Sequence, residues 1–191
     1  MTLTLAKPMT LAEYLTYDDG TDTCYELVNG ELIAMPTESD LNGRIASFLF
    51  SSFLQIGIVY YRVRIGIQIA VSGTRATAIQ PDLMVLSEEA ATALTGAVHA
   101  VITHDMPPPL LVVEVVSPKQ ESRDYRHKRT EYAGRQIPEY WVVDPIAQKV
   151  TVFTWVDGLY EEQVYQGEAT IVSSVFPALN LTAAQVLSAG Q

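Results

Sequence analysis

Cysteine and histidine are scarce in this chain, which has one cysteine and three histidines among 191 residues. A single thiol, Cys24, forms no internal disulfide, and no Cys/His cluster has the spacing of a zinc site. No run of about 18 apolar residues could span a bilayer, and Met1–Met9 has no apolar stretch typical of a signal peptide. These absences predict a soluble, cytoplasmic protein without a membrane segment.

Basic residues are also few, with 12 Lys and Arg against 22 Asp and Glu and a net charge of -10. This balance argues against tight nonspecific binding to nucleic acid, because lysine and arginine make the phosphate contacts. Six of the basic residues nevertheless lie between Ser117 and Arg135, where only three acids accompany them. The segment is either a phosphate-binding patch or the solvated face of a helix.

The composition is that of a globular protein, with 48% hydrophobic and 18% charged residues. A chain of 191 residues is long enough for one well-filled core, so we expect a single domain over residues 1–191.

Hydrophobic periodicity predicts a mixed α/β (α+β) fold with a sheet flanked by helices. Asn29-Gly30 separates two short strands and favours a two-residue hairpin turn. Helices are predicted over Thr10–Leu15, Ser39–Gly57, Arg123–Ala133 and from Thr182 onward, and Gly134 is expected to take the left-handed position that ends the third helix. Strands are predicted over Tyr25–Val28, Glu31–Met35, Arg64–Val71, Pro81–Leu86, Leu110–Val116, Tyr140–Val143, Val150–Val156 and Leu159–Tyr165.

Glu114 is an acid inside the most apolar run of the chain, Leu110–Val116, which reads as a central strand buried on both faces. A buried carboxylate costs several kcal/mol unless a cation or strong donors meet it. Glu114 is therefore a candidate site residue. Its alternative is structural, either at a sheet edge where the side chain reaches water or in an ion pair with Arg62 or Arg64.

Asp82 follows Pro81 at the start of the preceding strand, and Pro-Asp alone is a common turn dipeptide. Two strands adjacent in sequence can pair so that both carboxylates point at one Mg²⁺, which prefers oxygen ligands. Such an ion could activate water and neutralise charge on a phosphodiester.

Asp124, Lys128 and Tyr132 recur at intervals of four on the helix that follows Glu114, so they share one face. A lysine there could reach back over the acids as a point charge for water or phosphate. An ordinary Asp-Lys helix pair has the same spacing.

Taken together, these residues resemble the Uma-two family of restriction endonucleases, within the PD-(D/E)XK nuclease superfamily. The similarity runs from about Thr10 to Leu181 and rests on five blocks: Tyr25–Leu32, Pro81–Leu83, Leu111–Pro118, Asp124-x3-Lys128-x3-Tyr132 and Ile137–Pro145.

The resemblance implies a restriction-endonuclease-like fold and a metal-dependent nuclease that hydrolyses phosphodiester bonds. Asp82 and Glu114 match its acids and would hold Mg²⁺ or Mn²⁺ together with the carbonyl of Val115. Val116 stands where the motif would place lysine, so Lys128 would supply the ammonium. Its support would come from Asp124 and Tyr132, and Glu26 would be a further ligand or water-orienting group unless it is a solvated hairpin acid.

The implied partners are nucleic acid, with DNA expected, and a second copy of the chain in a homodimer. Two departures from the family pattern, Asn42 for a histidine and Gln80 for an arginine, affect the expected substrate contacts. They leave open a catalytically silent module that binds nucleic acid or protein. A Mg²⁺ phosphatase is disfavoured because no glycine loop typical of phosphate binding is visible.

Overall fold

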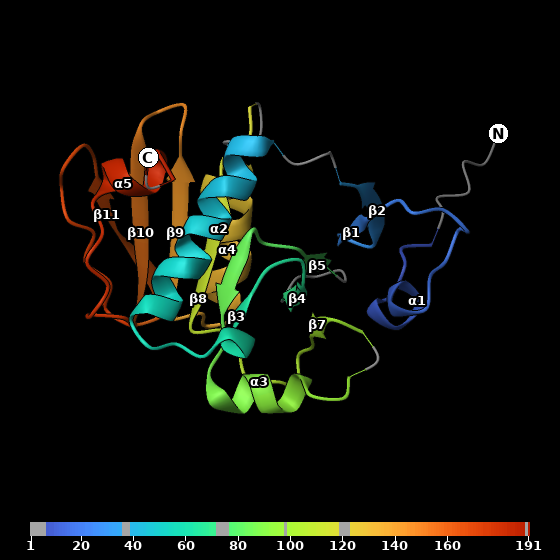
Figure 1. The fold of residues 1–191 in the computed structure, drawn as a ribbon. Coiled ribbons are helices and arrows are strands. Elements are labelled where there is room, and N and C mark those ends of the chain that lie inside the picture. The colour runs from blue at the N-terminus through green and yellow to red at the C-terminus, as the bar shows by residue number, and fades with distance from the viewer. Residues whose placement is uncertain (1–6, 36–38, 72–76, 98, 119–122, 190) are drawn as a thin grey trace.

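The computed structural model describes residues 7–35, 39–71, 77–97, 99–118, 123–189 and 191. Lys119 and Glu121 of the charged segment and the first six residues lie outside this part of the chain. The described residues form two mixed sheets with helices around them (Figure 1). Within the described part, every helix is too short or too polar to cross a bilayer.

The smaller sheet has five strands in the order β2-β1-β5-β4-β7. Its strands are β1 (Tyr25–Val28), β2 (Glu31–Ala34), β4 (Gln68–Val71), β5 (Thr77–Ile79) and β7 (Val101–Ile102). The hairpin between β1 and β2 is confirmed, because Asn29 and Gly30 both have positive φ angles, 53° and 81°, as a type I′ turn requires.

The larger sheet has six strands in the order β11-β10-β9-β8-β6-β3, with only β8 and β9 parallel among its pairs. Its strands are β3 (Val63–Arg64), β6 (Leu83–Val85), β8 (Leu111–Val115), β9 (Glu139–Asp144), β10 (Lys149–Val156) and β11 (Leu159–Tyr165). All five residues of β8 are buried, which confirms that it is a central strand.

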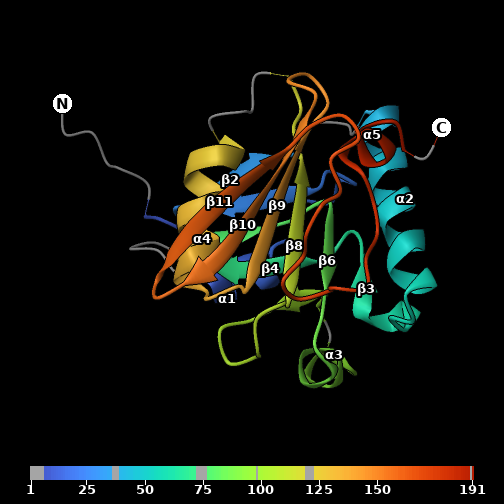
Figure 2. The same cartoon turned by 90° about the vertical axis from the view of Figure 1, so that its left-hand side faces the viewer.

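Helices cover both faces of the larger sheet (Figure 2). The helices of the described residues are α1 (Leu11–Leu15), which lies beside the smaller sheet, α2 (Asp40–Gln55), the 3-10 turn η1 (Tyr60–Arg62), α3 (Glu88–Leu94), the π-helical turn η2 (Arg123–Lys128), α4 (Arg129–Gly134) and α5 (Ala183–Leu187). α2 and α5 pack on one face, where Ile45 and Phe53 contact the core around Trp141. α4 lies on the other face, where Tyr132 and Tyr140 belong to a second core.

The predicted strand Arg64–Val71 is wrong as one element. Gly66 takes a φ of +73° and divides it into β3 and β4, which belong to different sheets. The alternation fails at the same place, since Ile65 is 46% exposed whereas Ile69 is fully buried. A left-handed glycine breaks a strand because its backbone leaves the extended conformation.

The end of α4 also differs from the prediction. Gly134 is the last helical residue, and the left-handed position is taken by Gln136, with a φ of 56°. The amide of Ile137 donates to the Tyr132 carbonyl and the amide of Gln136 donates to the Ala133 carbonyl. These two bonds form a Schellman motif, which satisfies the last helical carbonyls without a glycine at its left-handed position.

Candidate active site

Glu114 is placed by the pleat of β8. Its side chain points to the same side as Val112 and Val116, which belong to the core under α4, while Val113 and Val115 belong to the opposite core. Glu114 is only 3% exposed. Because β8 lies between β9 and β6, the edge-strand alternative for this residue is wrong. Arg62 is not its partner either, since that guanidinium pairs with Glu88.

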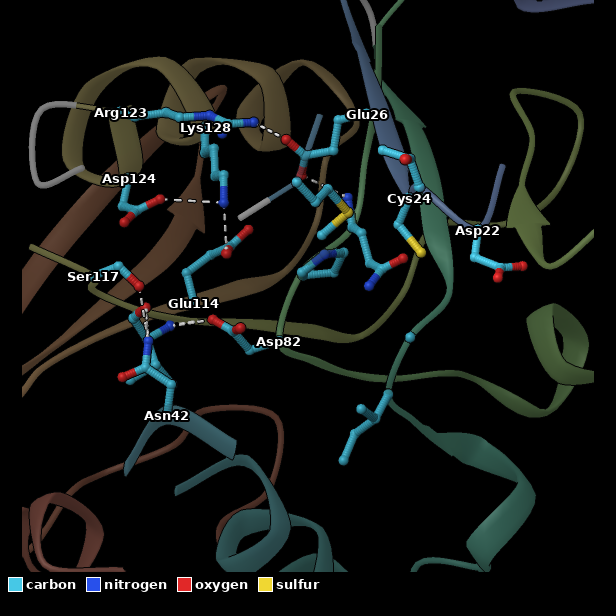
Figure 3. Close-up of a pocket in the computed structure, with 17 residues that line it drawn as sticks. Asp22, Cys24, Glu26, Asn42, Asp82, Glu114, Ser117, Arg123, Asp124 and Lys128 are labelled. Atoms are coloured by element: carbon cyan, nitrogen blue, oxygen red, sulfur yellow. Dashed lines mark hydrogen bonds and ion pairs between the residues drawn. The ribbon is translucent and has the colours of Figure 1, made fainter. Parts of the chain in front are cut away.

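Both oxygens of Glu114 have partners from the helical segment that covers this face, and Figure 3 shows the one with Lys128. The ammonium of Lys128, at the end of η2, lies 2.6 Å from Oε2, and the hydroxyl of Tyr132 in α4 donates to Oε1 at 2.6 Å. Lys128 also lies 3.2 Å from Asp124. All three predicted helix residues are buried on one face, so their expected shared orientation is confirmed.

Burial dominates the protonation of this cluster. It raises the pKa of Glu114 to about 8; Lys128 opposes the shift, and the nearby carboxylates of Asp82 and Asp124 add to it. Burial alone would lower the pKa of Lys128, but the attraction of Glu114 and Asp124 is stronger and holds that pKa above its usual value. Lys128 therefore stays protonated and acts as a fixed positive charge.

Asp82 lies directly before β6, which pairs with β8 so that Leu83 is opposite Val113. Asp82 Oδ2 accepts a hydrogen bond from the amide of Val115 at 2.5 Å, which fixes its carboxylate at the end of β8. The predicted pairing of two acid-bearing strands is thus present. Asp82, Glu114 and Val115 line one cavity.

Asn42 has a position that the sequence did not predict. From the first turn of α2, its Nδ2 donates to the carbonyl of Val115 at 3.2 Å and to the hydroxyl of Ser117 at 3.0 Å. Asn42 therefore contacts the very carbonyl that was expected to bind metal. In the sequence, Asn42 stood out only because it replaces a histidine that is common in the family. That difference did not predict the contact of Asn42 with the Val115 carbonyl.

Glu26 is buried in β1 and forms an ion pair with Arg123 in η2. Its other oxygen accepts a hydrogen bond from the backbone amide of Gln80 at 3.0 Å. The solvated-acid alternative for Glu26 is therefore wrong, because its side chain is only 4% exposed. Arg123 was seen in the sequence only as one member of the basic segment, although its guanidinium joins η2 to the smaller sheet beside the site.

The cavity that these residues line has a volume of about 610 Å³. Seven of its lining residues are charged: Asp22, Glu26, Asp82, Glu114, Asp124, Arg123 and Lys128. Five carboxyl groups therefore face two cationic groups, and this excess of acid favours a bound cation.

The oxygen donors fit the Mg²⁺ or Mn²⁺ expected from the sequence. Asp82, Glu114 and the Val115 carbonyl are hard ligands in one cavity, and such ions keep part of their water shell. Among the described residues, no group of three or more His, Cys, Asp or Glu is arranged so that it could hold a metal ion by itself. An ion would share Glu114 with Lys128 and Tyr132, and would share the Val115 carbonyl with Asn42.

Comparisons with known proteins identify a similar solved structure and a matching family. A solved structure from Anabaena variabilis ATCC 29413, described as "a putative nuclease belonging to DUF820", matches with a TM-score of 0.76 and 19% identity, over 96% of this chain and 100% of that one. This match confirms the expected fold class. A search of curated proteins returned no match. The model of the Uma2 family, "Putative restriction endonuclease", matches residues 11–184, and the chain therefore belongs to the Uma2 family.

Proposed function

We propose that this protein is a metal-dependent nuclease that hydrolyses phosphodiester bonds, with Asp82 and Glu114 as its metal-binding acids. The observation that carries the proposal is the meeting of both acids with the buried Lys128 in one cavity that has an excess of carboxyl groups. Membership of a family described as restriction endonucleases supports it.

The residues have separate roles in this proposal. Asp82, Glu114 and the Val115 carbonyl would hold Mg²⁺ or Mn²⁺, which supplies a water nucleophile and neutralises charge on the phosphate. Lys128 keeps its proton, so it orients water or stabilises phosphate charge by electrostatics and is not the general base. Tyr132 and Asp124 hold Glu114 and Lys128 in place.

Glu26 and Arg123 form the second half of the site. Glu26 has both oxygens occupied, so its role is to position Arg123 and the Gln80 backbone. Arg123 has five N–H donors and a side chain that is 29% exposed, compared with 7% for Lys128. Arg123 is therefore the lining cation better placed to receive a phosphate.

The alternative is a nuclease-fold module that binds nucleic acid or protein without catalysis. Two features favour it: Asn42 already donates to the Val115 carbonyl, and both oxygens of Glu114 already have partners. DNA as the substrate and the homodimer are parts of the proposal that rest on the family resemblance alone. The cytoplasmic location is a part that rests on the single cysteine and the lack of long apolar runs.

The decisive experiment measures cleavage of single-stranded DNA, duplex DNA and RNA with Mg²⁺, with Mn²⁺ and with a chelator. We expect metal-dependent cleavage that falls by about a hundredfold or more in Glu114→Gln and Lys128→Met. Glu162→Gln is the matched control, because Glu162 is a half-exposed acid of β11 that pairs with Arg129. Absence of cleavage on every substrate, or full activity of Glu114→Gln, would refute the proposal and favour the module.

A further inference from the structure

A second cavity, of about 330 Å³, adjoins the site cavity. The two share four lining residues: Thr23, Cys24, Gly66 and Gln80. In the view of Figure 3, Cys24 lies on the other side of Glu26 from Lys128. A ligand that occupies the site cavity therefore lies next to the second one, with only these shared residues between them.

The second cavity is aromatic, unlike the first. Tyr14 from α1, Tyr17 from the loop that follows and Tyr25 from β1 line it, together with His99. The rings of Tyr17 and Tyr25 meet edge to face, with centroids 5.9 Å apart and planes at 86°. Tyr17 is 42% exposed, so its ring is available to a ligand.

Hydrogen bonds fix this aromatic wall in place. The hydroxyl of Tyr14 donates to the Tyr25 carbonyl at 2.5 Å, and the side-chain amide of Gln68 donates to the same carbonyl at 2.8 Å. The hydroxyl of Tyr25 donates to Asp19 at 2.7 Å. A tyrosine ring whose hydroxyl is already hydrogen-bonded loses little conformational entropy when a ligand binds. This favours stacking of a flat ligand on the ring.

The two cavities differ in the basic residues that line them. No lysine or arginine belongs to the described residues that line the aromatic cavity, whereas Arg123 and Lys128 line the site cavity. In the site cavity a phosphate is suited only to the side of Arg123 and Lys128 and to the proposed metal ion, which offsets the carboxyl groups. An uncharged planar group is suited to the neighbouring cavity. A nucleotide carries both groups, and its base is the part that tyrosine and histidine rings stack on.

We infer that the aromatic cavity is a subsite for the nucleobase next to the phosphate bound in the site cavity, and that the substrate is therefore a nucleic acid with an unpaired nucleotide. This inference rests on the proposed function and narrows its substrate. A base that is paired in a duplex stacks on its neighbours, so it enters such a subsite only from a single strand or after extrusion.

The test measures binding, so it does not depend on cleavage. Fluorescence anisotropy with a labelled single-stranded oligonucleotide, run with a chelator and again with Ca²⁺, which takes the same oxygen ligands, compares the wild type with Tyr17→Ala. Removing one stacking ring should weaken binding about 5- to 150-fold. Tyr17→Phe retains the ring and should bind as the wild type does. Tyr60→Ala is the matched control, because Tyr60 is 70% exposed and absent from the lining of both cavities.

Two further ligands sharpen the result. An abasic single strand should bind wild type and Tyr17→Ala equally, and a blunt duplex should bind wild type more weakly than the single strand. Equal affinity of wild type and Tyr17→Ala for the base-containing strand overturns the inference, as does wild-type binding that does not distinguish single strand from duplex. These outcomes are independent of whether Glu114 supports metal-dependent cleavage, which alone decides the proposed function.

Discussion

The ammonium of Lys128 lies 2.6 Å from Glu114 Oε2, and the two side chains are only 7% and 4% exposed. They come from η2 and β8, so the contact joins the helical layer to the centre of the larger sheet. A buried ion pair of this kind stabilises little in itself, but removing one partner leaves an uncompensated charge. Substituting either residue should therefore change both the stability of the fold and the proposed metal site.

Removing the lysine charge should destabilise the protein. At pH 9, above the pKa of Glu114, we expect Lys128→Met to lower the free energy of unfolding by about 3 kcal/mol or more, because the ionised Glu114 then remains buried without its cation. Urea denaturation measures the loss. The double variant Glu114→Gln/Lys128→Met should recover part of it, since a neutral amide needs no counter-charge. A loss below about 1 kcal/mol in the single variant contradicts this account of the pair.

Stability should fall as pH rises through the neutral range. The pKa of Glu114 is about 8 in the folded protein against an ordinary value of 4.5, so folding favours its protonated form. This contribution is complete below pH 4.5 and is lost progressively up to about pH 8, with a slope of about 1.4 kcal/mol per pH unit.

Urea denaturation of wild type and Glu114→Gln at several pH values, with a chelator present, isolates this slope. The glutamine variant lacks the titrating group, so its stability should fall less steeply between pH 5 and pH 8. Parallel profiles for the two proteins would show that burial does not raise the pKa of Glu114.

Metal affinity should rise with pH over the same range. A cation that binds Glu114 must displace its proton below pH 8, which costs up to tenfold in affinity per pH unit. Calorimetric titration with Mn²⁺ from pH 6 to pH 8 measures this slope. Glu114→Gln should bind Mn²⁺ weakly at every pH, whereas Glu162→Gln should match wild type. An affinity independent of pH would place the ion away from Glu114.

Tyr132→Phe removes one hydrogen bond and little else. The hydroxyl donates to Glu114 at 2.6 Å, while the ring packs on Tyr140 with centroids 4.9 Å apart and is retained in phenylalanine. We expect a loss of about 1–2 kcal/mol in stability and of about tenfold or more in cleavage rate. Tyr160→Phe is the control, because that hydroxyl donates to the Ile137 carbonyl and not to Glu114. Equal effects of the two substitutions on cleavage would remove the positioning role of Tyr132.

Much of the fold follows from local sequence. The strand around Glu114 was predictable because a short run of β-branched residues favours a buried strand. The turn at Asn29-Gly30 was predictable because both residues accept positive φ angles. The two-residue strand β7 was not predictable, because so short a segment shows no periodicity. The break at Gly66 was missed because the alternation of isoleucines continues across it in the sequence.

The site residues were predictable where burying a charged group costs free energy, and not predictable where they depend on contacts between distant parts of the chain. Glu114 was predictable as a site residue because it is an acid in an apolar strand. The four-residue spacing from Asp124 to Lys128 predicted that they share one helix face. The bond between Asn42 and the Val115 carbonyl spans 73 residues, and that between Arg123 and Glu26 spans 97. No local pattern encodes such pairs, because they arise only when α2 and η2 pack against the sheets.

The most direct test of the central claim is anomalous diffraction from crystals grown with Mn²⁺. The account predicts one strong manganese peak within about 2.2 Å of carboxylate oxygens from both Asp82 and Glu114, with the Lys128 ammonium beside it. The peak should disappear in Glu114→Gln crystals grown under the same conditions. A peak only at surface acids such as Asp18 and Asp19, or none at saturating Mn²⁺, would contradict the account.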